Sequence, residues 1–255
     1  MDRITIEGLD SIEGIRVKIF EELESTNSYL KARAYTGLRE GELIVAKTQS
    51  QGRGRRGRSF YSPKDTGIYM SLLLEPTETV MVELVTAALA VAAARAIKKT
   101  LELDVKIKWV NDIFYENRKV AGILTEGLYS GGNKPDYLIV GIGINLYRPN
   151  DGFLDGLDEA GYLLEEKKEG LLNLLIKDLI QEFWPLYQNL DRREFLKEYK
   201  KRSLLLGREI LVLGEKPWKG LALDIDEDCN LLVEDQQGKV HSLYSGEVSV
   251  RTSLD

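Results

Sequence analysis

Cysteine and histidine are scarce in this sequence of 255 residues, which holds one of each, Cys229 and His241. A single cysteine excludes an intramolecular disulfide bond. His241 lies far along the chain from every charged motif, and we assign it no catalytic part. No N-terminal run combines a basic flank, an apolar core and a small-residue cleavage site, as a secretory signal would. These absences favour the cytoplasm.

Long apolar runs are also missing. The longest candidate, the alanine-rich residues 87–96, is shorter than the roughly 20 residues needed to cross a bilayer. We therefore expect no association with the membrane. With 43% hydrophobic and 30% charged residues, the composition is that of an ordinary globular protein that buries a real core. The length predicts one large domain, or one with a smaller companion.

An overall excess of positive charge is absent, because 35 lysines and arginines face 41 aspartates and glutamates, for a net charge of −6. Residues 207–255 hold ten acidic and five basic residues, which disfavours phosphate backbones as their partner. Any cationic site must therefore be local.

One such local cluster is the segment GRGRRGR at residues 52–58. Its glycines permit close approach of a ligand and positive φ angles, and its arginines offer forked donors for carboxylate or phosphate. We expect the segment to be mobile until an anion orders it. Taken alone, it favours a small anionic ligand, with a nucleic-acid arm and a plain surface turn as open alternatives.

The pattern of elements predicts an α+β fold. We expect a first strand near residues 17–20 and then a helix capped by Ser25, Thr26 or Asn27. A buried helix is predicted over residues 79–101, and two helices within 171–202, divided near Asp191, with Pro185 kinking or interrupting the first. Further strands are predicted within residues 41–51, 66–76, 105–129 and 135–147, and about five short strands after residue 207, forming a small β barrel.

A second charged cluster joins KWVND at residues 108–112 to RKVAGIL at 118–124. The first motif places a cation, an aromatic ring, an amide and a carboxylate within five residues. Core packing is the alternative for Trp109, and a turn position is the alternative for Asp112. Lys119 is flanked by apolar residues and is harder to explain without a ligand.

Five motifs in order, ESTN, TQSQGRGRRGR, KWVNDI, RKVAGIL and GIGIN, resemble those of the biotin protein ligases. The resemblance covers most of residues 15–146, and the small C-terminal β domain also fits the family. It implies a mixed-sheet catalytic domain of the class II synthetase-like, biotin ligase type over residues 1–204. It also implies an SH3-like β barrel over residues 205–255. Only about two dozen residues precede the STN motif, too few for a DNA-binding helix-turn-helix domain, so the resemblance implies the monofunctional form.

The resemblance implies a ligase that activates biotin with ATP to biotinyl-5'-AMP and transfers biotin to a lysine of a biotin carboxyl carrier protein domain. Biotin, ATP and Mg²⁺ are then required, and neither DNA nor a membrane is an expected partner. The identity of the acceptor carboxylase, the role of the C-terminal domain and the choice between monomer and homodimer stay open.

The resemblance also assigns the site residues in overlapping sets. The catalytic set is Lys119, Arg55 and Asp112, with Asp112 also the candidate Mg²⁺ ligand. The biotin-binding set is Ser25, Thr26, Asn27, Gln49, Gly52, Arg53, Gly54, Arg55, Lys119 and Gly122. The ATP and adenylate set is Arg55, Arg56, Arg58, Phe60, Lys108, Asn111, Asp112, Gly143 and Asn145. Cations are needed because a carboxylate must approach a triphosphate, and short polar side chains suit the neutral ureido ring.

Two positions depart from the family pattern, since Phe60 stands where many relatives have tryptophan and Val110 replaces a proline. Phe60 can still stack on or cover the adenylate, without an indole donor. Three other classes of protein are alternatives. A lipoate protein ligase would share the fold but lack the arginine loop, a nucleic-acid-binding module would need a basic stripe, and a noncatalytic homologue would not need Lys119 and Asp112.

Overall fold

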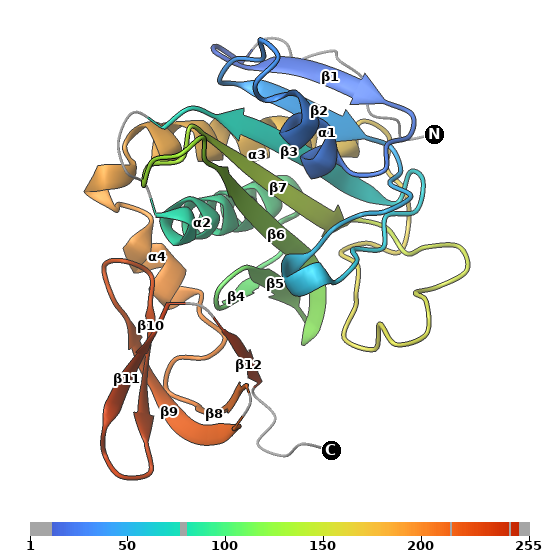
Figure 1. Ribbon diagram of the computed structural model, residues 1–255. Coiled ribbons are helices and arrows are strands. Elements are labelled where there is room, and N and C mark those ends of the chain that lie inside the picture. Colours follow the sequence, from blue (N-terminus) through green and yellow to red (C-terminus); the bar gives the residue numbers. More distant parts are fainter. Residues whose placement is uncertain (1–11, 77–80, 215, 245, 250–255) are drawn as a thin grey trace.

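The computed structural model describes residues 12–76, 81–214, 216–244 and 246–249, and divides them into a larger and a smaller part (Figure 1). The larger part is a seven-stranded sheet with helices on both faces, and the smaller part is a five-stranded sheet at its lower edge. The predicted α+β fold is thus confirmed. No helix in the described part of the chain is long and apolar enough to span a membrane.

The larger sheet is mixed, with the strand order β1-β2-β3-β7-β6-β5-β4. β1 pairs with β2 in parallel through the crossover helix α1, Thr26–Arg33, and all other neighbours are antiparallel. Its strands are β1 Arg16–Phe20, β2 Glu42–Ala46, β3 Gly67–Leu74, β4 Lys106–Lys108, β5 Asp112–Tyr115, β6 Arg118–Leu128 and β7 Tyr137–Asn145. Strands β2 and β3 are buried along their whole length, which explains their nearly continuous apolar sequences.

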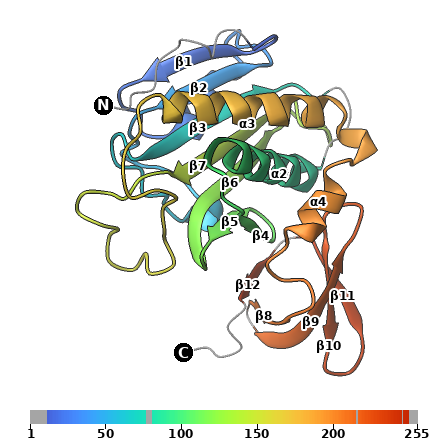
Figure 2. The ribbon, with the colours of Figure 1, turned by 180° about the vertical axis from the view of Figure 1, so that it is seen from behind.

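Helices α2, Val82–Leu101, and α3, Leu171–Gln188, cover one face of this sheet (Figure 2). The main core lies between them and the strands, because α2 is apolar nearly all round and its alanines allow close packing. Helix α1 lies on the opposite face, over β3 and β7 (Figure 1). The predicted start of α2 at residue 79 falls outside the described residues, and the helix begins at Val82.

Pro185 does not interrupt α3, so that part of the prediction was wrong. The helix continues through Pro185 to Gln188, and Asn189 N still donates to Pro185 O at 3.2 Å. Proline lacks a backbone N–H, so one intrahelical hydrogen bond, to Gln181 O, is lost while the rest of the helix is retained. The division near Asp191 is confirmed, with a 3-10 turn at Leu190–Arg192 before the short helix α4, Leu196–Lys201.

The smaller part is an antiparallel sheet with the strand order β11-β10-β9-β8-β12. Its five strands agree with the about five that the sequence predicts after residue 207. Its strands are β8 Glu209–Leu213, β9 Trp218–Ile225, β10 Leu231–Asp235, β11 Val240–Leu243 and β12 Glu247–Ser249. Helix α4 joins it to the larger part, and Lys200 Nζ lies 2.9 Å from Asp224 Oδ2 across the junction. Among the described residues, β12 comes back toward the larger sheet (Figure 1).

Candidate active site

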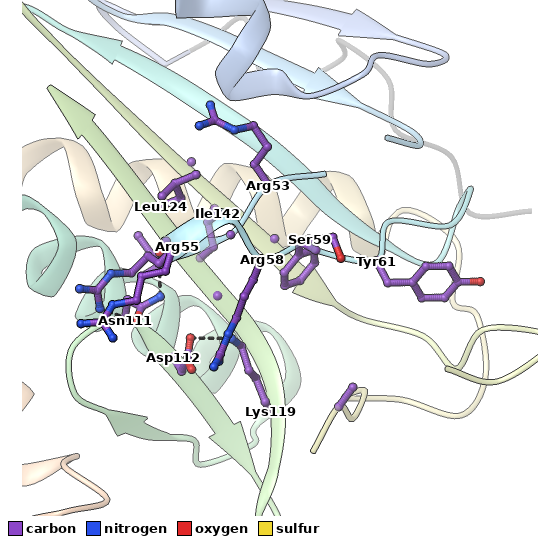
Figure 3. Close-up of a pocket in the computed structure, with 18 of the residues that line it drawn as sticks. Arg53, Arg55, Arg58, Ser59, Tyr61, Asn111, Asp112, Lys119, Leu124 and Ile142 are labelled. Atoms are coloured by element: carbon purple, nitrogen blue, oxygen red, sulfur yellow. Dashed lines mark hydrogen bonds and ion pairs between the residues drawn. The ribbon is translucent and has the colours of Figure 1, made fainter. Parts of the chain in front are cut away.

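A cleft of about 800 Å³ lies on the face of the larger sheet that carries α1. The segment 52–58, which we call the arginine loop, covers the cleft from one side. The turn between β4 and β5, residues 109–111, borders it on another side (Figure 3). Seventeen of the eighteen site residues that the sequence predicted line this cleft, although they come from segments more than 100 positions apart. Gly52 is the exception.

Glycines in the central strands make room for the cleft. Gly122 of β6 stands opposite Gly143 of β7, and Gly141 lies two residues away on the same face. A Cβ at Gly141 would lie 2.0 Å from Asn27 Oδ1, and one at Gly143 would lie 2.4 Å from the Phe60 ring. A side chain at either position would therefore displace a residue that lines the cleft.

One end of the cleft is a network of short, neutral polar side chains. Thr26 donates from both its backbone nitrogen and its hydroxyl to Gln49 Oε1, at 2.9 and 3.2 Å. The hydroxyl of Ser71, which is fully buried on β3, donates to Asn27 Oδ1 at 2.6 Å and lies 2.7 Å from the Thr26 hydroxyl. Ser25 caps α1 by accepting from Ser28 N. The network holds Thr26, Asn27 and Gln49 in fixed orientations at the cleft wall.

Glu126 connects this network to the arginine loop. Its Oε2 accepts from Asn27 Nδ2 at 3.0 Å and from Arg53 Nη1 at 2.9 Å, while Oε1 lies 3.4 Å from Lys31 Nζ. Burial would raise the pKa of Glu126, but the hydrogen bond from Asn27 and the charges of Arg53 and Lys31 lower it overall. Glu126 is thus a carboxylate held in its charged form.

The arginine loop is a short turn between two antiparallel stretches. Gly54 N donates to Arg58 O at 2.7 Å and Phe60 N donates to Gly52 O at 2.8 Å, on either side of the 3-10 turn Arg55–Gly57. Gly57 takes a positive φ of 75°, as expected for glycine, and Arg56 takes one of 55°. Whether an anion orders this loop stays a prediction.

Gly52 is the first residue of the loop and is not among the residues that line the cleft. A Cβ there would lie 2.3 Å from Phe60 O and 2.7 Å from Ser62 Oγ. The absence of a side chain at this position therefore allows the two stretches at the base of the loop to approach closely, and the predicted contact of Gly52 with biotin stays a prediction.

The arginines of the loop point in different directions. Arg53 pairs with Glu126 near the polar end of the cleft, whereas Arg55 and Arg58 point in other directions (Figure 3). Arg55 Nη1 donates to Asn111 Oδ1 at 3.2 Å, and Asn111 is itself fixed through Nδ2 to Ile123 O. Burial, followed by the charge of Arg56, lowers the pKa of Arg55, which nevertheless stays charged because a free guanidinium titrates above about 12.

Lys119 and Asp112 form an ion pair at the opposite wall, with 2.7 Å between Nζ and Oδ1 (Figure 3). Among the described residues, Asp112 Oδ1 is buried without a hydrogen bond of good geometry. The backbone of Lys119 is fixed by residues 159–161, since its nitrogen donates to Glu159 O and its carbonyl accepts from Gly161 N. The ammonium group is therefore presented to the cleft from a rigid strand.

Phe60 and Asn145 complete the cleft between these two ends. The Phe60 ring packs on Gly143 and lies edge-on to Tyr69, with 6.4 Å between ring centroids. Asn145 is buried and donates from Nδ2 to Gly161 O at 3.0 Å. Asn145 therefore supports the segment that holds Lys119, in addition to lining the cleft.

Comparison with known proteins agrees with this geometry. The profile of the Biotin/lipoate A/B protein ligase family matches residues 19–145, and that of the Biotin protein ligase C terminal domain matches residues 205–251. The bifunctional ligase/repressor BirA of Escherichia coli is 30% identical over 257 aligned residues, which cover 96% of this chain and 77% of the relative. The chain belongs to the biotin protein ligases.

Other relatives of this ligase agree with that assignment. The biotin--[acetyl-CoA-carboxylase] ligase of Mycobacterium tuberculosis is 27% identical, with 88% of this chain and 85% of the relative aligned. The biotin protein ligase from Aquifex aeolicus, solved in complex with biotin and ATP, matches with a TM-score of 0.75 at 27% identity, covering 92% of this chain and 97% of that one.

Sequence reasoning missed three residues that lie against Asn27, a residue of the cleft wall, in the structure of this ligase. Ser71, Glu126 and Gly141 all contact Asn27 or would collide with it. Ser71 is the single polar residue in an apolar strand, and Gly141 opens the GIGIN motif, so both carried a signal. Glu126 carried none, because one glutamate in a sequence rich in acids does not stand out.

Proposed function

We propose that this cleft joins biotin to ATP and then passes the biotin to a lysine of a biotin carboxyl carrier protein domain. The observation that carries the proposal is the division of one cleft into a neutral polar end and a cationic end. Biotin has the same division, with a neutral ureido ring at one end and a carboxylate at the other. The relative solved with biotin and ATP supports both as substrates.

The polar end suits the ureido ring. Thr26, Asn27 and Gln49 offer both donors and acceptors there, and the ring needs both. Since their hydrogen bonds to Ser71, Glu126 and one another already fix these side chains, little entropy remains to be lost on binding.

The cationic end stabilises the first step. A carboxylate oxygen of biotin forms a bond to the α-phosphorus of ATP, and the bond from that phosphorus to the bridging oxygen breaks as pyrophosphate leaves. Negative charge accumulates at the phosphorus in between. Arg55 and Lys119 are held by Asn111 and Asp112 at the walls of the same cleft, so they can stabilise this charge without reorganising.

Asp112 fits one ligand position of a magnesium ion. Its buried Oδ1 lies 2.7 Å from Lys119 Nζ and makes no hydrogen bond of good geometry among the described residues, and Mg²⁺ prefers oxygen ligands. In the described residues no group of three or more His, Cys, Asp or Glu side chains forms a complete metal site. A magnesium ion would therefore take its remaining ligands from phosphates and water, and would neutralise phosphate charge.

In the second step the amine of the acceptor lysine attacks the acyl carbon of the adenylate, and AMP leaves with its phosphate oxygen. The amine must lose a proton as the amide forms. Asp112 can accept a hydrogen bond from that amine through the carboxylate oxygen that is not paired with Lys119. The arginine loop, which covers the cleft, excludes water from the anhydride.

The domain bounds, the cellular location and the partners also belong to this proposal. We propose a catalytic unit at residues 1–204 and a C-terminal β domain at 205–255, a cytoplasmic location, and no DNA partner. A homodimer stays open, as does the identity of the carboxylase. Lipoate as substrate is disfavoured because the second matching profile is specific to biotin protein ligases. A nucleic-acid arm is disfavoured because Arg53 and Arg55 bond to groups of their own chain.

The direct test mixes purified protein with labelled biotin, MgATP and an apo carrier domain. We expect label on one lysine of the carrier domain. When the carrier domain is left out, we expect biotin-dependent exchange between pyrophosphate and ATP. If neither label nor exchange occurs, the enzyme assignment is refuted.

A further inference from the structure

The turn that carries Asn111 and Asp112 is held by the C-terminal sheet. Trp109, two residues before Asn111, donates from its indole Nε1 to the backbone carbonyl of Cys229 at 2.8 Å. Cys229 lies in the connection between β9 and β10 of the small sheet, 120 positions further along the chain. The Trp109 side chain is only 4% exposed, and a Cβ at Gly246 would lie 3.7 Å from its ring.

A second hydrogen bond fixes the same turn from α4. The hydroxyl of Tyr199, which is 1% exposed, donates to Val110 O at 3.0 Å. Helix α4 is also the element that leads into the small sheet, and Lys200 pairs with Asp224 on β9. Residues 109 and 110 are therefore tied to α4 and to the β9–β10 connection, while the next two residues contact the cationic groups of the cleft.

These next two residues are the partners of both candidate catalytic cations. Asn111 Oδ1 accepts from Arg55, and Asp112 pairs with Lys119. A shift of the turn would move both partners together. In contrast, the polar end of the cleft is held by α1, β2, β3 and Glu126 of β6, and none of its described hydrogen bonds involves the turn.

We propose that Trp109 is a positioning residue, through which the C-terminal sheet aligns Asn111 and Asp112 for the adenylation step. This inference rests on the proposed function and assigns the C-terminal domain a role that the sequence left open. The proposal also predicts that the polar end and the cationic end of the cleft respond differently to the same substitution. Loss of the indole donor should impair the use of MgATP while biotin binding is retained.

The test compares Trp109→Phe, which keeps an aromatic ring but removes the donor, with Tyr199→Phe, which removes the other bond to the turn. Lys200→Met is the matched control, because it removes a contact between the same two parts of the protein without touching the turn. For each we would measure biotin affinity by calorimetry without ATP, and kcat/KM for MgATP by pyrophosphate exchange.

We expect kcat/KM for MgATP to fall about tenfold in both turn variants, because misaligned partners of Arg55 and Lys119 weaken the stabilisation of the transition state by about 1.4 kcal/mol. The biotin Kd should stay within about twofold of wild type, because the hydrogen bonds of the turn are not part of the polar end of the cleft, where biotin binds without ATP. The control should match wild type in both measurements. Unchanged exchange in Trp109→Phe, or an equal loss of biotin binding, would overturn the proposal.

Hydrogen exchange provides a readout that does not depend on activity. In wild type, Ile123 N donates to Asn111 O at 2.9 Å, so this amide reports on the turn. Trp109→Phe should speed its exchange and leave the amides of α1 unchanged, and equal rates in both proteins would contradict the role of Trp109. A wild-type protein without exchange activity would instead refute the proposed function, so the two failures are distinguishable.

Discussion

Replacing Lys119 by methionine removes the ammonium group and keeps most of the apolar stem. The stem matters because a Cβ at Gly122 would already lie 3.3 Å from Lys119 Cε, so this wall of the cleft is closely packed. The ammonium group is 2.7 Å from Asp112 Oδ1, and the Lys119 side chain is one-third exposed and lines the cleft, so it is available to an arriving anion. Removal of one such preorganised charge from a transition state costs on the order of 10² to 10³ in rate.

The expected result is a fall in the rate of biotin-dependent pyrophosphate exchange by about 10² or more, with only a several-fold weaker biotin Kd. The difference arises because charge grows at the phosphorus during reaction, whereas the ground-state carboxylate is already partly neutralised by Arg55. Single-turnover quench measurements give the rate, and calorimetry gives the affinity.

Lys98→Met is a suitable control, since Lys98 makes an ion pair of 2.8 Å with Asp104 at the exposed end of α2. It should leave the exchange rate unchanged. If Lys119→Met weakens biotin binding by the same factor as it slows exchange, Lys119 contributes only to binding and the electrostatic argument fails.

Three further predictions follow from other parts of the cleft. Gly141→Ala should weaken biotin binding by at least about tenfold in calorimetry, because its Cβ would lie 2.0 Å from Asn27 Oδ1, whereas Gly214→Ala has no neighbour within 4 Å and should bind normally; equal affinities would contradict this. Glu126→Gln should reduce the loss of thermal stability on acidification. The lowered pKa of Glu126 means that its charged form stabilises the folded protein. This stabilisation is complete above the ordinary pKa of a glutamate, about 4.3, and is lost as the pH falls below it. Parallel melting curves against pH in both proteins would refute that assignment. Arg55→Gly should release biotinyl-5'-AMP about tenfold faster and increase the labelling of unrelated lysines, and an unchanged dissociation rate would exclude a retaining role.

The elements of the fold were largely predictable because each has a local signal. The apolar runs of β2 and β3 lie between turn residues, and the alanine-rich α2 is apolar on all sides. Pro185 was misjudged because a proline removes one intrahelical hydrogen bond, and the burial of Phe183 and Leu186 on either side of it, which keeps the chain helical, depends on tertiary packing.

The site was predictable as a set of motifs but not as a set of contacts. Ser71 reaches Asn27 across 44 positions and Glu126 reaches it across 99. These contacts depend on the sheet order, in which β7 is inserted between β3 and β6. The Trp109 bond to Cys229 depends on how the two sheets are placed. None of these distances is encoded in a local pattern.

The central claim is that one cleft activates biotin at its cationic end before any acceptor is present. Incubation of the protein with biotin and MgATP alone, followed by rapid desalting and mass spectrometry of the bound ligand, tests this claim most directly. We predict biotinyl-5'-AMP bound to the protein, and its complete conversion to AMP and a biotinylated lysine when an apo carrier domain is added. Unmodified biotin as the sole bound ligand would contradict the account.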